Sequence, residues 1–209
     1  MKIIKLSSLG LFGVNAYIAV SDKGNGVLID APDGANEILR KLETENIKLK
    51  MILLTHGHCD HIASAVEIAR KTGAQVYIHS ADLKKLTNDR LNLTEYFSLP
   101  PTEAVEAAET VEDGQVLTLD EMDFEILHTP GHTSGSVCYI LNDNMFCGDT
   151  LFSGSIGRTD MPDGDSLVMK DTLDMLREFD PKTDYRLLPG HGENSTISTE
   201  RKSNPFLRG

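Results

Sequence analysis

Residues 55–61 read Thr-His-Gly-His-Cys-Asp-His, so three histidines and one aspartate fall within six consecutive positions. Packing does not require this density of imidazole, because each buried neutral histidine must find a partner for both ring nitrogens. Neutral imidazole and carboxylate are the usual protein ligands for zinc and related divalent ions. The four side chains at His56, His58, Asp60 and His61 therefore predict a metal site.

The spacing within this segment places the four side chains on two sides of one turn. Side chains alternate along an extended chain, so His56 and His58 can point the same way. Asp60 and His61 fall where the next helix is expected to begin, and they can face the same cavity from another direction. One metal could take the first pair while a neighbouring metal takes the second.

Three further segments place a metal-competent side chain on a glycine-containing turn at the end of a predicted strand. They are Thr-Pro-Gly-His-Thr around His132, Cys-Gly-Asp-Thr around Asp149 and Pro-Gly-His-Gly around His191. Strand ends joined by loops are where a rigid scaffold presents functional groups. These three residues could supply the ligands that two metal sites still need.

Short apolar runs bounded by turn residues predict strands over most of the chain, at 2–9, 15–20, 27–30, 49–55, 75–79, 116–119, 124–128, 136–141, 145–147 and 185–188. Apolar residues at helical spacing predict helices at 35–46, 62–72 and 166–179. Residues 80–112 are expected to be irregular. Many strands follow one another directly, so the fold class is α+β, and two mixed sheets packed face to face with helices outside would bury both sets.

Length, net charge and cysteine content exclude several classes of protein. The 209 residues show no composition break, which predicts one domain over 1–209. The net charge of −12 repels phosphate backbones, so no nucleic-acid partner is expected. No segment approaches the length of a membrane span, and three cysteines argue against a disulfide framework and for a reducing compartment. A cytoplasmic enzyme that is a monomer or homodimer is expected.

The pattern His-x-His-x-Asp-His, followed by the later histidines and aspartate, resembles the metallo-β-lactamase superfamily. The likeness runs from the Leu-Ile-Asp strand end at 28–30 to the Asn-Pro-Phe stretch at 204–206. It implies a four-layer αβ/βα sandwich with a binuclear site at the rim between the sheets. It assigns to the first metal His56, His58 and His132, to the second Asp60, His61 and His191, and to both the bridging Asp149. The two divalent ions are expected to be zinc, with iron or manganese as alternatives.

Within the superfamily the chain is most similar to small glyoxalase II-like hydrolases. The marks are Thr-Pro-Gly-His-Thr at 129–133, Gly-Asp-Thr-Leu-Phe at 148–152, Gly-Arg-Thr-Asp at 157–160 and Asn-Pro-Phe-Leu at 204–207. The resemblance implies hydrolysis of a small-molecule thioester, such as a hydroxyacylglutathione, by a metal-bridged hydroxide that Asp60 also orients. The known enzymes have a helical C-terminal region that contributes to glutathione binding. Only residues 192–209 follow the last ligand here, so the acyl or thiol half of the substrate could differ.

An oxidoreductase is the alternative from another class. Persulfide dioxygenases share this fold, the histidine cluster and the Gly-Arg-Thr-Asp stretch. They use one iron held by residues that match His56, His132 and Asp149. A purely structural metal site ranks last, because seven candidate ligands exceed the roughly four that a closed site needs.

Several other residues admit two roles. Arg158 could pair with a carboxylate of the substrate or with an internal acid such as Asp160. Asp30 ends a strand beneath the expected site, where it could support the metal loops or cap the following helix. Residues 90–101 carry two aromatic side chains in a loop-like stretch, which favours either local packing or a cover over the substrate.

Three residues near the predicted site are expected to have no ligand role. Cys59 would project opposite its histidine neighbours. His79 and His128 have no motif partner of their own, so each is expected to be a structural or exposed histidine.

Overall fold

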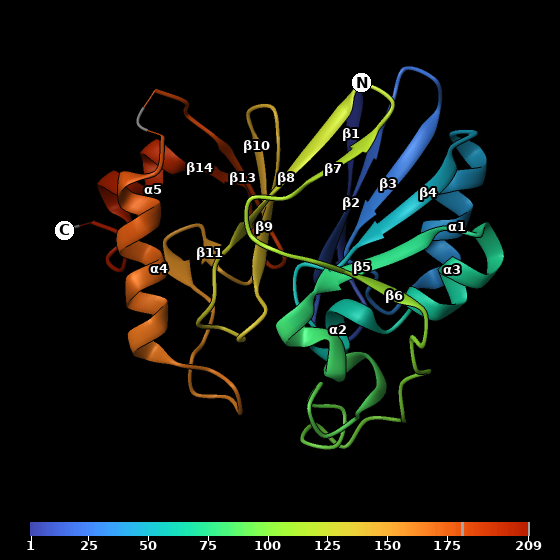
Figure 1. Cartoon of the computed structure of the whole chain (residues 1–209), viewed down its shortest axis with the longest axis horizontal. Helices are drawn as coiled ribbons and strands as arrows, with labels where there is room; N and C mark the ends of the chain where they lie inside the picture. The colour runs from blue at the N-terminus through green and yellow to red at the C-terminus, as the bar shows by residue number, and fades with distance from the viewer. Residues whose placement is uncertain (181, 209) are drawn as a thin grey trace.

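Two β-sheets lie face to face with helices on both outer sides in the computed structural model of the chain, shown in Figure 1. The structure describes residues 1–180 and 182–208. Helices α1 and α3 cover one sheet and helices α4 and α5 cover the other, so the layers run helix, sheet, sheet, helix. The predicted α+β sandwich of two mixed sheets is confirmed.

The first sheet has six strands in the order β1-β2-β3-β4-β5-β6. Their bounds are Lys2–Leu9, Val14–Val20, Asn25–Ile29, Lys48–Leu53, Gln75–His79 and Ala108–Val111. The first three strands pair antiparallel, and β3 to β6 pair parallel. Parallel neighbours need a crossover connection. Helix α1 (Ala35–Thr44) supplies one, and helices α2 (Cys59–Ile62) and α3 (Ala65–Thr72) supply the next.

The second sheet has six strands in the order β14-β13-β10-β9-β8-β7. Their bounds are Ser195–Thr196, Arg186–Pro189, Asn144–Gly148, Val137–Leu141, Met122–His128 and Val116–Leu119. All neighbours pair antiparallel except β10 and β13, which are parallel. The crossover between those two contains a small hairpin, β11 (Leu151–Phe152) with β12 (Ser155–Ile156), and helix α4 (Ser166–Glu178). Helix α5 (Ile197–Ser203) follows β14.

Apolar side chains fill three layers. The layer between the sheets contains large buried residues from both of them, including Tyr17, Phe124, Tyr139, Phe146 and Leu188. A second layer lies between the first sheet and helices α1 and α3, and a third lies between the second sheet and helices α4 and α5. Burial of this apolar surface is the main force that holds the sheets together.

The structure contains β11, β12, β14 and α5, which the sequence patterns do not predict, and it differs from the expectation at two further places. The helix expected at 62–72 is divided into α2 and α3, because Ser64 donates its backbone N–H to the Ala31 carbonyl at 2.8 Å and the chain turns there. The stretch expected to be irregular, 80–112, contains a 3-10 helix, η1 (Ser80–Thr87), and the edge strand β6. Only Val111 of β6 is fully buried, so this strand has little apolar alternation for a sequence pattern to show.

The carboxyl ends of β4, β8, β10 and β13 meet at one edge of the sandwich. Hydrogen bonds join the two sheets there: the Tyr139 hydroxyl donates to the Leu54 carbonyl at 3.0 Å, and the Val137 N–H donates to the Thr55 carbonyl at 2.9 Å. The four loops that leave these strand ends therefore start from a fixed frame. Among the described residues, no helix is long and apolar enough to span a lipid bilayer.

Candidate metal centre

Each predicted ligand leaves the end of a strand at this edge. The segment that contains His56, His58, Asp60 and His61 follows β4 and enters helix α2. The three remaining ligands, on the loops after β8, β10 and β13, are His132, Asp149 and His191. The structure brings all seven side chains together in overlapping groups whose ligand atoms lie within 4.8 Å of one another.

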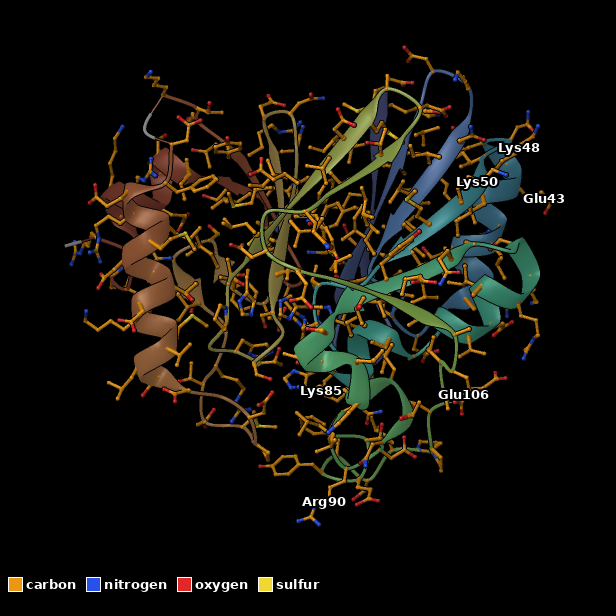
Figure 2. All side chains as sticks on the ribbon, viewed as in Figure 1. Glu43, Lys48, Lys50, Lys85, Arg90 and Glu106 are labelled. Carbon is orange, nitrogen blue, oxygen red and sulfur yellow. The ribbon has the colours of Figure 1, made fainter. Side chains whose placement is uncertain are left out.

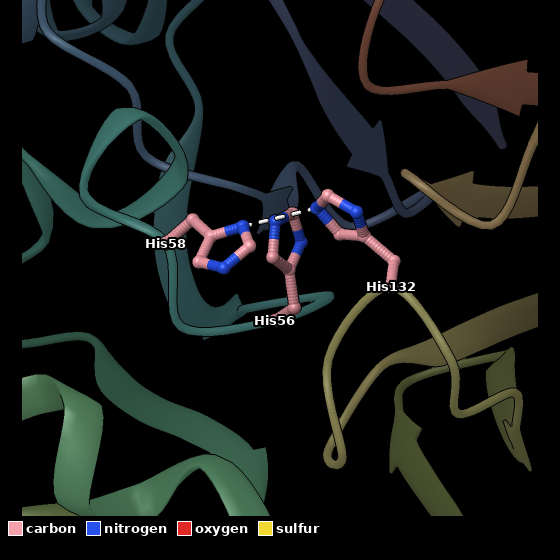
Figure 3. Close-up of side chains that lie close together, drawn as sticks. All are labelled: His56, His58 and His132. Atoms are coloured by element: carbon pink, nitrogen blue, oxygen red, sulfur yellow. Dashed lines mark hydrogen bonds between the residues drawn. The ribbon is translucent and has the colours of Figure 1, made fainter. Parts of the chain in front are cut away.

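The first group is formed by His56, His58 and His132, whose rings converge in Figure 3. The ring centroid of His56 lies 4.8 Å from that of His58 and 4.8 Å from that of His132. The Nδ1 atom of His58 approaches the Nε2 atom of His132 to 3.0 Å. All three side chains are buried. Three imidazoles from two separate loops thus point at one position.

The second group is formed by Asp60, His61 and His191, and Asp149 lies between the two groups. One oxygen of Asp149, Oδ1, is 3.4 Å from His61 Nε2. The other, Oδ2, is 3.5 Å from His191 Nε2 and 3.6 Å from His132 Nε2. A carboxylate with one group on each side has the position that a bridging ligand requires.

Four buried polar atoms of this cluster have no hydrogen-bond partner, namely the Nε2 atoms of His56, His58 and His61 and the Oδ1 atom of Asp149. Buried polar atoms are nearly always paired in folded proteins, and several unpaired atoms that face one point indicate a place for a water molecule, an ion or a ligand. A donor set of imidazole nitrogens and carboxylate oxygens suits zinc, iron and manganese. The residues present therefore fit one or two divalent ions.

Burial sets the charge state of His56 and His58. It lowers the pKa of His58 to about 3, helped by the nearby His132. It also lowers the pKa of His56 well below its usual value, with His61 as the next cause. Both rings are neutral at pH 7, and a neutral ring has the lone pair that coordination needs.

The carboxylates of the cluster remain ionised. Burial alone would raise the pKa of Asp149, but the charges of His61, His132 and His191 outweigh it, so the pKa falls below its usual value. The pKa of Asp60 is lowered in the same way, against burial, chiefly by His61. Ionised carboxylates in a buried site favour a cation beside them.

His61 lies in a field that favours positive charge. Burial lowers its pKa, but the three carboxylates Asp30, Asp149 and Asp60 together raise it well above the usual value. Either a proton or a metal ion can supply the positive charge that this field favours. The pKa of His191 is raised for a similar reason, because Asp60 and Asp149 outweigh its burial.

Asp30 holds the loop after β4 on the side that faces away from the metal cluster. Its Oδ2 atom lies 2.8 Å from His61 Nδ1, and its Oδ1 atom accepts the Thr55 N–H at 2.8 Å. The Thr55 hydroxyl donates to Asp30 and lies 3.1 Å from His56 Nδ1. These contacts orient two rings through the nitrogen that faces away from the cluster. The helix-cap role is not observed, because α1 has Gly34 at its N-cap and no capping side chain.

The turn that carries His191 approaches the cluster closely because it contains Gly190. A Cβ atom at this position would lie 2.5 Å from Asp149 Oδ1 and 2.6 Å from His61 Cε1. The Asn15 side chain holds this turn from the first sheet by donating to the Pro189 carbonyl at 3.0 Å. The first glycine of the Pro-Gly-His-Gly motif, Gly190, is therefore required, because any larger side chain would collide with the cluster.

Asp82, in η1, is a support that sequence reasoning missed. It is fully buried, and its Oδ2 atom accepts the Gly57 N–H at 2.8 Å and the Thr133 hydroxyl at 2.9 Å. Its Oδ1 atom accepts the Gly135 N–H at 2.9 Å. Gly57 lies between two predicted ligands, and Thr133 and Gly135 follow a third. One carboxylate thus fixes the loops after β4 and β8 against each other.

A buried lysine completes this support. Lys85 Nζ donates to Asp82 at 2.5 Å and to Asp163 at 2.6 Å. A Cβ atom at Gly57 would lie 2.6 Å from Lys85 Cβ, so the lysine stem packs directly under the histidine loop. The only sequence signal was the Asp-x-x-Lys spacing after a strand, which is too common to identify a support.

The cluster opens into a cavity of about 320 Å³. Its walls outside the cluster are mostly apolar and comprise Leu93, Phe97, Phe152, Ile156 and Met161, with Ser155 and Arg158 at the side. Arg158 makes a bidentate pair with Asp160, at 2.7 and 2.9 Å, so the internal partner foreseen for it is present. Arg158 still lines the cavity, and its carbonyl oxygen lies 2.8 Å from His132 Nδ1.

Cys59, His79 and His128 lie outside the clusters of possible ligands formed by the described residues. The rings of His79 and His128 stack on each other with centroids 4.1 Å apart. The Cys59 thiol is buried, and its backbone N–H donates to the Asn92 carbonyl at 2.8 Å.

Comparison with known sequences gives near full-length matches. The profile of the family described as the Metallo-beta-lactamase superfamily matches residues 9–191. The hydroxyacylglutathione hydrolase GloC of Haemophilus influenzae is 34% identical over 209 residues, which cover 98% of this chain and 97% of that protein. The probable metallo-hydrolase YqgX of Bacillus subtilis is 33% identical, covering 96% of this chain and 95% of that protein.

Solved structures also match nearly the whole chain. The BLEG-1 B3 metallo-beta-lactamase matches with a TM-score of 0.92 and 31% identity, covering 100% of both chains. The protein TTHA1623, solved in a di-iron-bound form, matches at 0.86 and 31%, covering 98% of this chain and 100% of that one. ETHE1 from Myxococcus xanthus matches at 0.76 and 26%, covering 98% and 84%.

We predict that Asp82→Asn weakens metal binding about 10- to 100-fold, the range typical of lost support behind ligands. The amide nitrogen of asparagine cannot accept a hydrogen bond, so the N–H of either Gly57 or Gly135 loses its partner. Competition with a chelating dye measures the affinity. The control is Asp163→Asn. It removes the second carboxylate that pairs with Lys85 but leaves the contact between Asp82 and Gly57. Equal affinities of wild type and Asp82→Asn would contradict the role.

We also predict that no cysteine reacts quickly in the folded protein. Burial raises the pKa of Cys59 and of Cys138 to about 11, and it raises that of Cys147 well above its usual value. At pH 8 a thiol with such a pKa is about one part in a thousand thiolate. Dithiobis(nitrobenzoate) should find no fast thiol in the native state and three in the unfolded state. A fast native thiol that disappears in Cys59→Ser would contradict this.

Proposed function

The chain belongs to the metallo-beta-lactamase superfamily, and on that basis we propose that it is a metal-dependent hydrolase whose substrate is a thioester. Membership supports an enzyme of the metallo-hydrolase type. The thioester is supported by the relative described as a hydroxyacylglutathione hydrolase and by the shape and chemistry of the cavity above the cluster.

The proposed sites follow the two groups of side chains. One ion would be held by His56, His58 and His132, and the other by Asp60, His61 and His191, with Asp149 shared between them. Bound divalent ions supply Lewis acidity, which lowers the pKa of water and polarises a carbonyl group. Zinc is the proposed metal, and iron is the alternative because a relative was solved with two irons.

Asp60 is the residue proposed to orient the attacking water. Its carboxylate is ionised, it borders the cavity, and its Oδ2 atom lies 3.5 Å from His191 Nε2. An ionised carboxylate accepts a hydrogen bond from water and so fixes the direction of attack on the acyl carbon. Apolar side chains, which include Leu93 and Phe97, line the cavity beside this point.

The observation that carries the choice of a thioester is the lack of a spare proton donor. Among the described residues that line the cavity, every titratable side chain belongs to the proposed ligand set except Arg158, which stays protonated. An amine or alcohol leaving group needs a proton, whereas a thiol of pKa about 8.5 can leave as a thiolate. Water oxygen bonds to the acyl carbon, the carbon–sulfur bond breaks, and a carboxylic acid and a thiol result.

We predict that the purified protein hydrolyses S-lactoylglutathione and loses this activity when its metal is removed by a chelator. His132→Ala or Asp149→Ala should lower kcat/KM at least about 100-fold, because several kcal/mol of transition-state stabilisation come from the ion. Thioester absorbance measures turnover, and circular dichroism checks that the variants are folded. Full activity in metal-depleted protein would refute the proposal. A β-lactam assay belongs beside it, because one similar structure is a B3 metallo-beta-lactamase.

A second candidate is oxidation of a persulfide at a single iron. Its proposed ligands His56, His132 and Asp149 also lie within reach of one another, since His56 and Asp149 share a cluster and His132 is 3.6 Å from Asp149. The di-iron-bound relative favours testing iron. Oxygen uptake on glutathione persulfide with one iron per chain, and no thioester turnover, would select this function.

A further inference from the structure

A second and larger cavity adjoins the one above the metal cluster. It has a volume of about 910 Å³ and runs between η1, the segment that follows it and the 161–163 loop. Its polar lining includes Lys84, Asn88, Arg90, Glu95, Tyr96 and Ser134. None of these is among the proposed metal ligands, so this groove has no part in the chemistry described above.

The groove continues the cavity above the cluster. Leu93 lines both of them, and on the opposite side Met161 lines the smaller cavity while Pro162 and Asp163 line the groove. Leu93 has a φ of 72°, a left-handed conformation that is rare for a bulky residue. Strain of this kind persists only where the surroundings impose it, and it is often found at ligand sites.

The segment that carries Leu93 is tied to the metal loop. The carbonyl of Asn92 accepts the Cys59 N–H at 2.8 Å, and the Asn92 side chain donates to the Lys85 carbonyl at 3.1 Å. Asn92 also accepts the Thr94 N–H at 3.0 Å, and it is fully buried. The wall between the two cavities therefore has a fixed position relative to the proposed ligands.

The groove has the opposite charge to the rest of the chain. Within the described part of the chain, neither Lys84 nor Arg90 forms an ion pair, whereas the buried Lys85 is matched by two carboxylates. The charged side chains of the lining are Lys84, Lys85 and Arg90 against Glu95 and Asp163, which sum to about +1 in a chain of net charge −12. Figure 2 shows Arg90 at the outer end of this segment and Lys85 closer to the body.

We propose that this groove binds the thiol half of the substrate, and that this half is an elongated thiol with an anionic group that Lys84 and Arg90 recognise. The inference rests on the proposed thioester hydrolysis. The smaller, mostly apolar cavity then takes the acyl half, because it borders the cluster and the arginine in its lining, Arg158, is already paired with Asp160. The scissile bond lies beside Leu93, where the two cavities meet.

The test compares lactoyl thioesters of three thiols: neutral N-acetylcysteamine, glutathione with its carboxylates and coenzyme A with its phosphates. In Lys84→Ala/Arg90→Ala, kcat/KM for the preferred anionic thioester should fall about tenfold, mainly through KM, since two charge-assisted contacts are lost. The value for the neutral thioester should change less than about twofold. The wild-type preference between the two anionic substrates identifies carboxylate or phosphate as the recognised group.

A matched control is Lys48→Ala, which removes an exposed cation on the far side of the molecule (Figure 2). It should leave all three values unchanged. An equal loss on the neutral and the anionic thioesters, or no loss on either, would overturn the groove assignment while thioester hydrolysis stands.

If wild type hydrolyses none of the three, the proposed function fails instead, and binding then tests the groove. Calorimetry with S-methylglutathione and S-methyl-coenzyme A should show binding of one of them that weakens about tenfold in the double variant. Absence of binding, or equal binding by wild type and variant, would overturn the assignment.

Discussion

The arrangement at the carboxyl edge of the sandwich depends on a group of buried polar atoms that cannot satisfy one another. The Nε2 atoms of His56, His58 and His61 and the Oδ1 atom of Asp149 all lack partners, and desolvation keeps the first two rings neutral. Such atoms are costly to bury unless a cation joins them. The rings of His56 and His61 are held through their Nδ1 atoms, so the fold fixes their direction and leaves their Nε2 atoms open to coordination.

Two buried carboxylates, on opposite sides of the cluster, hold the loops that carry the proposed ligands. Asp30, at the end of β3, holds Thr55 and His61, while Asp82, in η1, holds Gly57 and the loop after His132. Neither is expected to touch a metal ion. Asp30 fixes the loop after β4, whereas Asp82 accepts bonds from the loops after β4 and β8, so the relative position of these two loops follows from hydrogen-bond geometry as well as from sheet packing. Removing Asp82 should therefore move ligands on both loops, whereas removing Asp30 should move those of the loop after β4.

The sequence could predict the side chains that converge, because residue type and short spacing carry that information: His56, His58, Asp60 and His61 are all within one turn. It could also predict the sandwich, since apolar periodicity marks most strands. It could not predict Asp82, because the partners of this residue lie 25, 51 and 53 positions away and no local pattern records them. The division of the expected helix at Ser64 has a similar cause, a backbone bond to the distant Ala31.

One short segment joins the cavity wall to the loop that carries four of the proposed ligands. Asn92 joins the backbone of Cys59, inside the metal loop, to the segment that places Leu93 and Phe97 in the cavity walls. Phe97 in turn packs against Phe12 of the β1–β2 loop, with ring centroids 5.1 Å apart. A wall attached to the ligand loop cannot shift without disturbing the ligands. Within the stretch 90–101, the buried residues 92–94 are thus tied to the metal loop, while the aromatic side chains of Tyr96 and Phe97 are exposed.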